Sequence, residues 1–138
     1  MSVATFAFLQ AVGGRSLLNP DSPPPASVEE AVREHLVVLL NTRQGTLEHL
    51  PDYGMPDVSS FYGSAPESLE LLGAAIREVI ARYEPRIEGL KVELEEVSHE
   101  GFGATYRIEG VVVVPGGESR PVAFHTRVTS SGFTKVER

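Results

Sequence analysis

The chain has 138 residues, 41% of them hydrophobic and 22% charged, which suits one compact domain with its own core. It contains no cysteine, which excludes a disulfide framework and a thiolate zinc site. The net charge of −7, with two lysines among 12 basic residues, disfavours nucleic-acid and membrane-surface binding, because both need a clustered basic face. Since no stretch approaches the roughly eighteen apolar residues of a membrane span, we expect a cytoplasmic protein without membrane insertion.

Residues 1–26 are predicted to be separate from the folded body. The segment from Gly13 to Ala26 holds two glycines and four prolines, a composition typical of a stiff, extended linker. We therefore predict an N-terminal arm with a proline-rich linker over residues 1–26 and one folded domain over residues 27–138.

A first amphipathic helix is predicted to begin after Ser27 and to end near Asn41. Ser27 and Glu30 have the spacing of a capping box, in which Ser27 accepts from the N–H of Glu30 and the Glu30 carboxylate reaches back. Apolar residues then recur at three- and four-residue spacing, at Val28, Ala31, Val32, Leu36, Leu39 and Leu40. The irregular stretch that follows, residues 42–63, is long for a structureless loop, and its apolar residues indicate that it packs against the body.

A second helix is predicted to end at the residue before Pro85, because proline disfavours helical geometry at Glu84. Its buried stripe comprises Leu69, Leu72, Ile76, Val79, Ile80 and Tyr83.

After the second helix the apolar period changes to two, which predicts strands with one exposed face. The alternating sets are Leu90, Val92 and Leu94; Ala104, Tyr106 and Ile108; and Val122, Phe124, Thr126 and Val128. Val111 to Val114 interrupt the alternation, which indicates either two-sided burial or a bulge near Gly110. The predicted fold is α+β, with two helices packed on a small antiparallel sheet of three or more strands. The last clear strand, Pro121 to Val128, is one candidate for a free edge, because Pro121 lacks an N–H, which suits an edge or the start of a strand.

No cofactor, metal or catalytic residue is predicted. The four histidines (His35, His49, His99 and His125) fall in four different segments without the spacing of metal ligands. The chain also lacks a nucleophile elbow and a phosphate-binding glycine loop.

Three short strings carry a family resemblance. Leu39 to Arg43 (Leu-Leu-Asn-Thr-Arg) ends the first helix, and Tyr53 to Asp57 (Tyr-Gly-Met-Pro-Asp) stands in the long loop. Glu84-Pro85-Arg86 closes the second helix. In this order and spacing the three strings resemble the TssE and phage baseplate-wedge family, sometimes labelled lysozyme-like, over about residues 27–128.

This resemblance implies a structural subunit of a type VI secretion baseplate, which joins the wedge and serves as the platform for assembly of the contractile sheath. Its partners would be other wedge subunits (TssF, TssG and TssK-like) and the sheath, and no catalytic activity is implied. The alternatives are a phage-tail-like wedge protein and, less favoured, a peptidoglycan muramidase. A muramidase needs a general acid in an apolar setting, whereas Glu93 and Glu95 are predicted on the wet face of a strand.

Ten residues of these strings are the predicted partner-binding residues: Asn41, Thr42, Arg43, Tyr53, Gly54, Pro56, Asp57, Glu84, Pro85 and Arg86. Each string also has a purely structural interpretation, as a helix C-terminus, a packed turn and a corner salt bridge respectively. For Glu84-Pro85-Arg86 we favour a docking role, because a rigid corner can present a charged pair with little ordering cost.

Overall fold

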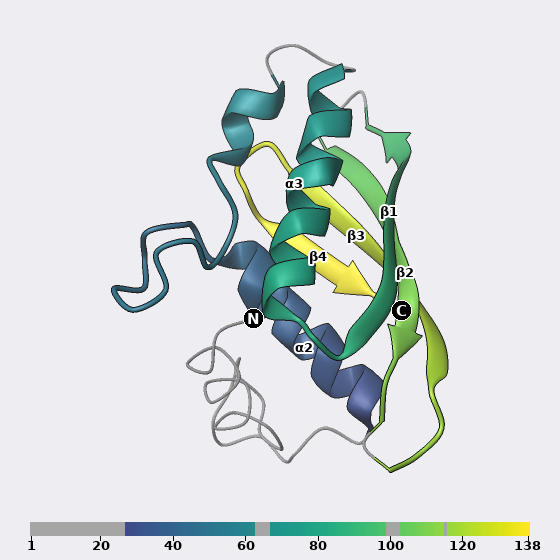
Figure 1. Ribbon diagram of the computed structural model, residues 1–138. Helices are drawn as coiled ribbons and strands as arrows, with labels where there is room; N and C mark the ends of the chain where they lie inside the picture. Colours follow the sequence, from purple (N-terminus) through teal and green to yellow (C-terminus); the bar gives the residue numbers. More distant parts are fainter. Residues whose placement is uncertain (1–26, 63–66, 99–102, 115) are drawn as a thin grey trace.

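Two helices pack on one side of an antiparallel sheet (Figure 1). The structure, a computed structural model, describes residues 27–62, 67–98, 103–114 and 116–138, so the predicted arm over residues 1–26 lies outside the described residues. The helices are α2 (Val28–Asn41), the short 3-10 helix η1 (Val58–Tyr62) and α3 (Glu67–Tyr83). The strands are β1 (Ile87–Val97), β2 (Gly103–Val112), β3 (Arg120–Thr129) and β4 (Thr134–Glu137), in the order β1-β2-β3-β4. The predicted α+β fold is confirmed.

The helix boundaries follow from local chemistry. The Ser27 hydroxyl accepts a hydrogen bond from the N–H of Glu30 at 3.1 Å, so the predicted N-cap is confirmed. The reciprocal half of the capping box is wrong, because the Glu30 carboxylate instead accepts from Arg33 Nε at 2.8 Å. Helix α3 ends at Tyr83, as the position of Pro85 predicts.

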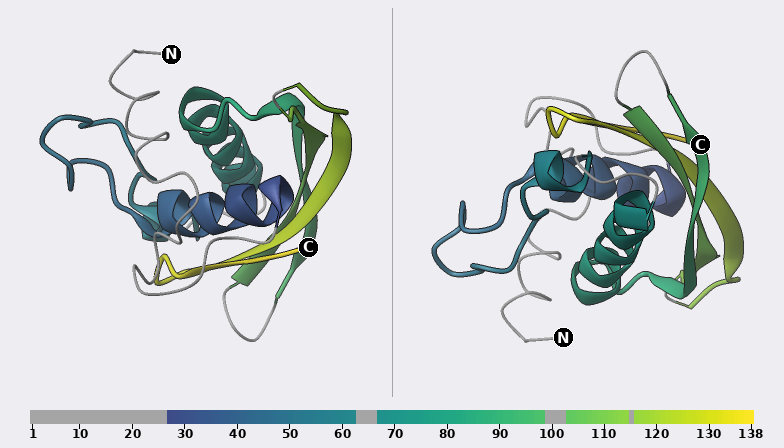
Figure 2. Two further views of the ribbon diagram at one scale, coloured as in Figure 1. Left: turned by 90° about the horizontal axis from the view of Figure 1, so that it is seen from below. Right: turned by 90° about the horizontal axis from the view of Figure 1, so that it is seen from above.

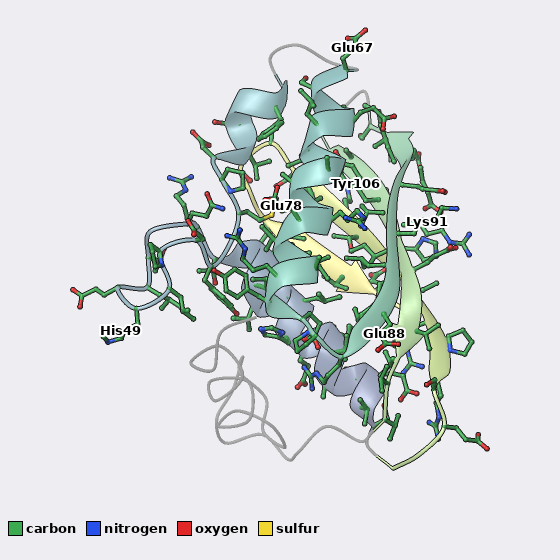
Figure 3. All side chains as sticks on the ribbon, viewed as in Figure 1. His49, Glu67, Glu78, Glu88, Lys91 and Tyr106 are labelled. Carbon is green, nitrogen blue, oxygen red and sulfur yellow. The ribbon has the colours of Figure 1, made fainter. Side chains whose placement is uncertain are left out.

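The interface between helices and sheet is apolar and continuous. Figure 2 shows both helices on the same side of the curved sheet. The side chains buried there include Val32, Leu36 and Leu39 of α2, Leu72, Ile76 and Ile80 of α3, and Tyr106, Ile108 and Phe124 of the sheet. Tyr106 lies between α3 and the sheet (Figure 3), and its hydroxyl donates to the carbonyl of Leu69 at 2.6 Å. Burial of this stripe positions the ends of both helices, where the candidate residues lie.

A bulge does occur opposite Gly110, with the extra residue on β1. Glu88 pairs with Val111 and Lys91 with Glu109, so two residues of β1 oppose the single residue Gly110. A Cβ atom at Gly110 would lie 2.4 Å from Cγ2 of Ile87, so only glycine fits there. Of the two interpretations that the sequence left open, the bulge is therefore the correct one.

The prediction that Pro121 to Val128 forms a free edge is wrong over half its length. Thr134 to Glu137 form β4 and pair with residues 125–128 of β3, which makes that part of β3 an inner strand. Two alternating residues, Thr134 and Val136, face the core. Four residues are too short for a period-two pattern to be recognised in the sequence.

Candidate functional site

The predicted docking corner follows directly on α3. The N–H of Glu84 donates to the carbonyl of Ile80 at 2.8 Å, and Pro85 then turns the chain out of the helix. The N–H of Val113 donates to the carbonyl of Arg86 at 2.9 Å, which ties the corner to the end of β2. Glu84 is buried with 1% of its surface exposed, whereas the Arg86 side chain is 30% exposed. The Glu84 carboxylate is therefore covered by the chain itself, and Arg86 is the more accessible charge at this corner.

Four side chains form a polar chain from the corner into the core, which we call the corner network: Arg86, Glu84, His35 and Tyr53. Arg86 donates to Glu84 through Nε (2.6 Å, to Oε1) and Nη2 (3.0 Å, to Oε2). The Nδ1 atom of His35 lies 2.5 Å from Oε2 of Glu84, and its Nε2 atom lies 3.1 Å from the Tyr53 hydroxyl. The network joins the corner, the middle of α2 and the long loop, which are remote in sequence.

Burial and hydrogen bonding have opposite effects on the Glu84 carboxyl. Burial raises its pKa, but the hydrogen bonds from His35 and Arg86 and their nearby charge outweigh burial, so the pKa lies below its usual value. For Tyr53, burial first, and then the neighbouring Glu84 carboxylate, raise the pKa of the phenol. Glu84 is thus held ionised and Tyr53 neutral, so the network contains a fixed buried negative charge that is compensated by Arg86.

The second string, Tyr53 to Asp57, packs against the first, as predicted for this loop. The N–H of Met55 donates to the carbonyl of Thr42 at 2.7 Å, and the N–H of Gln44 donates to the carbonyl of Met55 at 2.9 Å. Gly54 has a φ of +107°, and a Cβ atom there would lie 2.2 Å from the Thr42 carbonyl oxygen. The two strings therefore fit together only with glycine at position 54.

Asn41 is an exposed residue whose side chain binds β4 of the same chain. Its side-chain amide donates to the carbonyl of Thr134 and accepts from the N–H of Thr134, both at 2.8 Å. Further along β4, Arg33 Nη1 donates to the carbonyl of Val136 at 3.3 Å. These α2 side chains occupy backbone groups on the side of β4 that faces away from β3, so they cover that edge of the sheet.

The most exposed charges among the candidate residues are Arg43 and Asp57. Their side chains are 71% and 60% exposed, and Arg43 Nη2 lies 3.9 Å from Oδ1 of Asp57. Hydrogen bonds from the hydroxyl and N–H of Ser59 lower the pKa of Asp57. A shallow hollow of about 110 Å³ lies beside this pair and extends to Ser131 and Gly132 in the β3–β4 turn. Arg43, Asp57 and the partly exposed Arg86 are thus the charged candidates able to reach another molecule.

Between the first two strings the chain projects from the body as a loop over residues 44–52 (Figure 1), with His49 near its tip (Figure 3). The N–H of Gly45 donates to the carbonyl of Pro51 at 2.9 Å, which closes the base of the loop. Arg82 of α3 pairs with Asp52 at 3.3 Å. The loop is therefore anchored at its base, which lies beside the corner network.

Residues 26–114 match the family model of the baseplate wedge protein gp25. The chain belongs to the gp25 baseplate wedge family. This places it among the structural wedge components of contractile injection systems.

Two solved structures resemble this gp25-family chain. A chain of the baseplate complex from the type VI secretion system has a TM-score of 0.59 and 26% identity, over 73% of this chain and 93% of that chain. A protein of Geobacter sulfurreducens that has been proposed to be a tail lysozyme has a TM-score of 0.53 and 22% identity, over 72% and 90% of the two chains. The second likeness is one of fold. A comparison with curated proteins found no match.

All ten predicted partner-binding residues lie within the part of the chain that matches the gp25 family. The structure brings the three strings together around Thr42, Tyr53 and Glu84, but it buries Tyr53, Gly54 and Glu84. The surface left for a partner consists of the exposed residues Asn41, Arg43, Asp57 and Pro85, with Thr42, Pro56 and Arg86 partly exposed.

His35 is the member of this gp25-family site that the sequence did not single out. The sequence treated it as one of four scattered histidines, yet it lies three residues after Val32 on the buried side of α2. A histidine inside an apolar stripe needs buried hydrogen-bond partners, and this signal was available in the sequence.

Among the residues that the structure describes, no three histidine or acidic side chains gather as a metal site. Within the same residues, no helix is long and apolar enough to cross a membrane.

Proposed function

We propose that this gp25-family chain is a baseplate subunit of a type VI secretion system, which joins the wedge and serves as the platform on which the contractile sheath assembles. The observation that carries the proposal is the likeness to a chain of the type VI secretion baseplate complex, at 26% identity over 93% of that chain. Partners of the TssF, TssG and TssK kinds and the first sheath subunits follow from this role. It also places the protein in the cytoplasm.

The docking surface would be the exposed part of the three strings. Arg86 provides a guanidinium at the corner after α3. Arg43 lies just after the end of α2, and Asp57 lies just before η1. Arginine suits such a surface because its planar guanidinium binds carboxylates in a bidentate manner. The Arg43–Asp57 pair is exposed, so it adds little to the stability of the fold, and both side chains are accessible to a partner.

The sheath would bind at β1. Among the described strands, β1 pairs with β2 on one side and with no strand on the other, whereas α2 side chains cover the outer side of β4. An unpaired edge can accept an extended segment of another chain by strand addition. The exposed side chains of β1 are mostly acidic (Glu88, Glu93, Glu95 and Glu96, with Lys91 as the exception), which favours a basic segment.

The test is purification of the tagged full-length protein from the cells that encode it, with mass spectrometry of what co-purifies. We expect wedge subunits and sheath protein, and Arg43→Ala should reduce their recovery by about fivefold or more while the melting temperature stays unchanged. Glu67→Ala, an exposed change at the start of α3, is the matched control and should bind normally. Recovery of phage tail proteins instead would favour the alternative, a wedge protein of a phage-like tail, and overturn the secretion assignment.

A muramidase activity has weaker support. The likeness to the proposed tail lysozyme is one of fold, and fold does not imply function. A glycosidase general acid needs a raised pKa, whereas the buried carboxyl group in this site, Glu84, has its pKa lowered by His35 and Arg86. The strand carboxylates Glu93 and Glu95 lie beside Lys91 and His125 on the exposed face, away from an apolar pocket. We therefore propose a structural, non-catalytic role.

A further inference from the structure

The corner network is a continuous polar connection between the surface at Arg86 and the loop over residues 42–57. Only one end of it is open to solvent, because Arg86 is 30% exposed while Glu84, His35 and Tyr53 are each at most 2% exposed. Its members come from the corner, from the middle of α2 and from the loop over residues 42–57. Apolar side chains such as Leu39, Ile80 and Tyr83 are buried in the same core. Loss of a hydrogen bond at one member of such a buried polar network affects the next member, because each buried polar group must keep a partner.

Each link depends on the one before it. The Glu84 carboxylate accepts three hydrogen bonds, two from Arg86 and one from His35 Nδ1. If Arg86 leaves, this buried carboxylate keeps one partner, and the imidazole must shift to compensate it. Both ring nitrogens of His35 are engaged, and Nδ1 already lies 2.5 Å from Oε2 of Glu84, so the ring follows any displacement of the carboxylate. Such a displacement or rotation of the ring alters the contact to the Tyr53 hydroxyl.

Tyr53 in turn holds the loop. Its ring stands edge-on to Tyr83, with centroids 5.1 Å apart. The next residues carry the two backbone hydrogen bonds between Met55 and the chain at Thr42 and Gln44. Because Gly54 already approaches the Thr42 carbonyl closely, a shift of Tyr53 alters this pairing.

We propose that the corner network couples Arg86 to the loop over residues 42–57, with His35 as the positioning residue. The loop is held most firmly when Arg86 is bound to Glu84, and it loosens when Arg86 turns to a carboxylate of another molecule. This second half rests on the proposed docking function. The first half is a property of the isolated chain and can be tested without any partner.

Hydrogen exchange of the full-length protein, followed by mass spectrometry or NMR, provides the test. Arg86→Gln, which removes the charge, should speed exchange at the amides of Gln44 and Met55 by about fivefold or more, although the Arg86 guanidinium binds Glu84 and not the loop. Amides of β2 and β3 should change less. The control is Arg107→Gln, which makes the same chemical change in an exposed arginine–glutamate pair, with Glu109 on the far face of the sheet, and should leave the loop unchanged.

A double-variant cycle separates coupling from general weakening. Tyr53→Phe removes only the hydroxyl that contacts His35 Nε2, and in that background Arg86→Gln should no longer speed exchange in the loop beyond the single change. His35→Asn, whose amide can still donate to Glu84 but is too short for Tyr53, should behave like Tyr53→Phe. A loop response equal to that of Arg107→Gln, a uniform acceleration over the whole chain, or additive effects in the double variant would each overturn the proposal.

If Arg86→Gln does not fold, Arg86→Lys keeps the charge but loses the bidentate contact, and it should give a smaller acceleration in the same loop amides. The outcome is independent of the purification experiment. Coupling measured in the isolated chain stands even if no wedge subunit binds, and wedge binding without loop coupling removes this inference alone.

Discussion

Glu84 is a buried carboxylate, and hydrogen-bond donors of neighbouring side chains bind both of its oxygens. It receives two donors from a guanidinium and one from an imidazole, so the buried charge is compensated by hydrogen bonds on both carboxylate oxygens. The sequence alone placed Glu84 and Arg86 in one exposed ion pair, because Glu-Pro-Arg has no feature that reveals which side chain turns inward. The pairing was predictable from the string, whereas the burial arises from the apposition of α2 and the loop.

The lowered pKa of Glu84 predicts acid sensitivity. Because its pKa in the folded state lies below the ordinary value of 4.5, ionised Glu84 stabilises the fold above about pH 4.5, and this contribution is lost as the pH falls through the folded-state pKa. Glu84→Gln should lower the free energy of unfolding by about 3 kcal/mol at pH 7. Urea unfolding at pH 7 and pH 3.5 should show a smaller loss on acidification in Glu84→Gln than in the natural protein. Equal losses in the two proteins would contradict the assigned pKa direction.

Gly54 predicts a localised steric effect. Gly54→Ala combines a φ of +107° with a Cβ only 2.2 Å from a backbone oxygen, so we expect a loss of at least about 2 kcal/mol in thermal or chemical unfolding. Gly45→Ala is the matched control. It also has a positive φ, of +90°, but no atom lies within 4 Å of the added Cβ, so it should cost only about 1 kcal/mol. Similar losses in both variants would show that close packing at Gly54 is unimportant.

At the scale of elements, the strongly periodic parts of the chain were predictable and the short or strained parts were not. Helix α3 and its end at Tyr83 follow from an apolar stripe and Pro85, and the alternation in β2 and β3 follows from period two. The four residues of β4 carried too little pattern. Because β4 was not predicted, β3 was taken as the last strand of the sheet and as a candidate free edge, whereas β4 covers half of it.

The free side of β1 predicts an asymmetric response to proline. Successive N–H groups of a strand point alternately to the neighbour and away from it, so one of Val92→Pro and Glu93→Pro removes an outward donor and the other breaks the pairing with β2. The variant that removes an outward donor should fold and fail to support sheath assembly in cells. The variant that breaks the pairing with β2 should be destabilised. Circular dichroism identifies the folded variant, and electron microscopy scores sheaths. Normal sheaths with the folded variant would exclude strand addition at β1.

At the scale of the whole molecule, the three strings form one surface because the fold brings the ends of two helices to the loop between them. Sequence order and spacing were sufficient to group the strings into a family. They were insufficient to separate Arg43, which is exposed, from Tyr53, which is buried, because that separation depends on contacts with His35 and Tyr83. His35, which connects Glu84 to Tyr53, was consequently not predicted as part of the site.

A structural role predicts the absence of lytic activity. Purified full-length protein should not clear a suspension of peptidoglycan over several hours, at pH 5 or at pH 7, while lysozyme in the same buffer clears it. The reason is chemical, since the buried carboxyl group in the site is held ionised by Arg86 and cannot donate a proton. Clearing that persists in Glu84→Gln would point to other carboxylates, and any reproducible clearing would contradict the non-catalytic role.

Asn41 and Arg33 cover the outer side of β4, so the two edges of the sheet are not equivalent. Within the part of the chain described, α2 side chains cover β4, so β1 is the longest edge of the sheet at which another strand can be added. Under the proposed function, each copy of the protein would then start one sheath strand at β1. The number of copies in the baseplate would set the number of starting points in the first ring, and growth would have a fixed polarity from its first step.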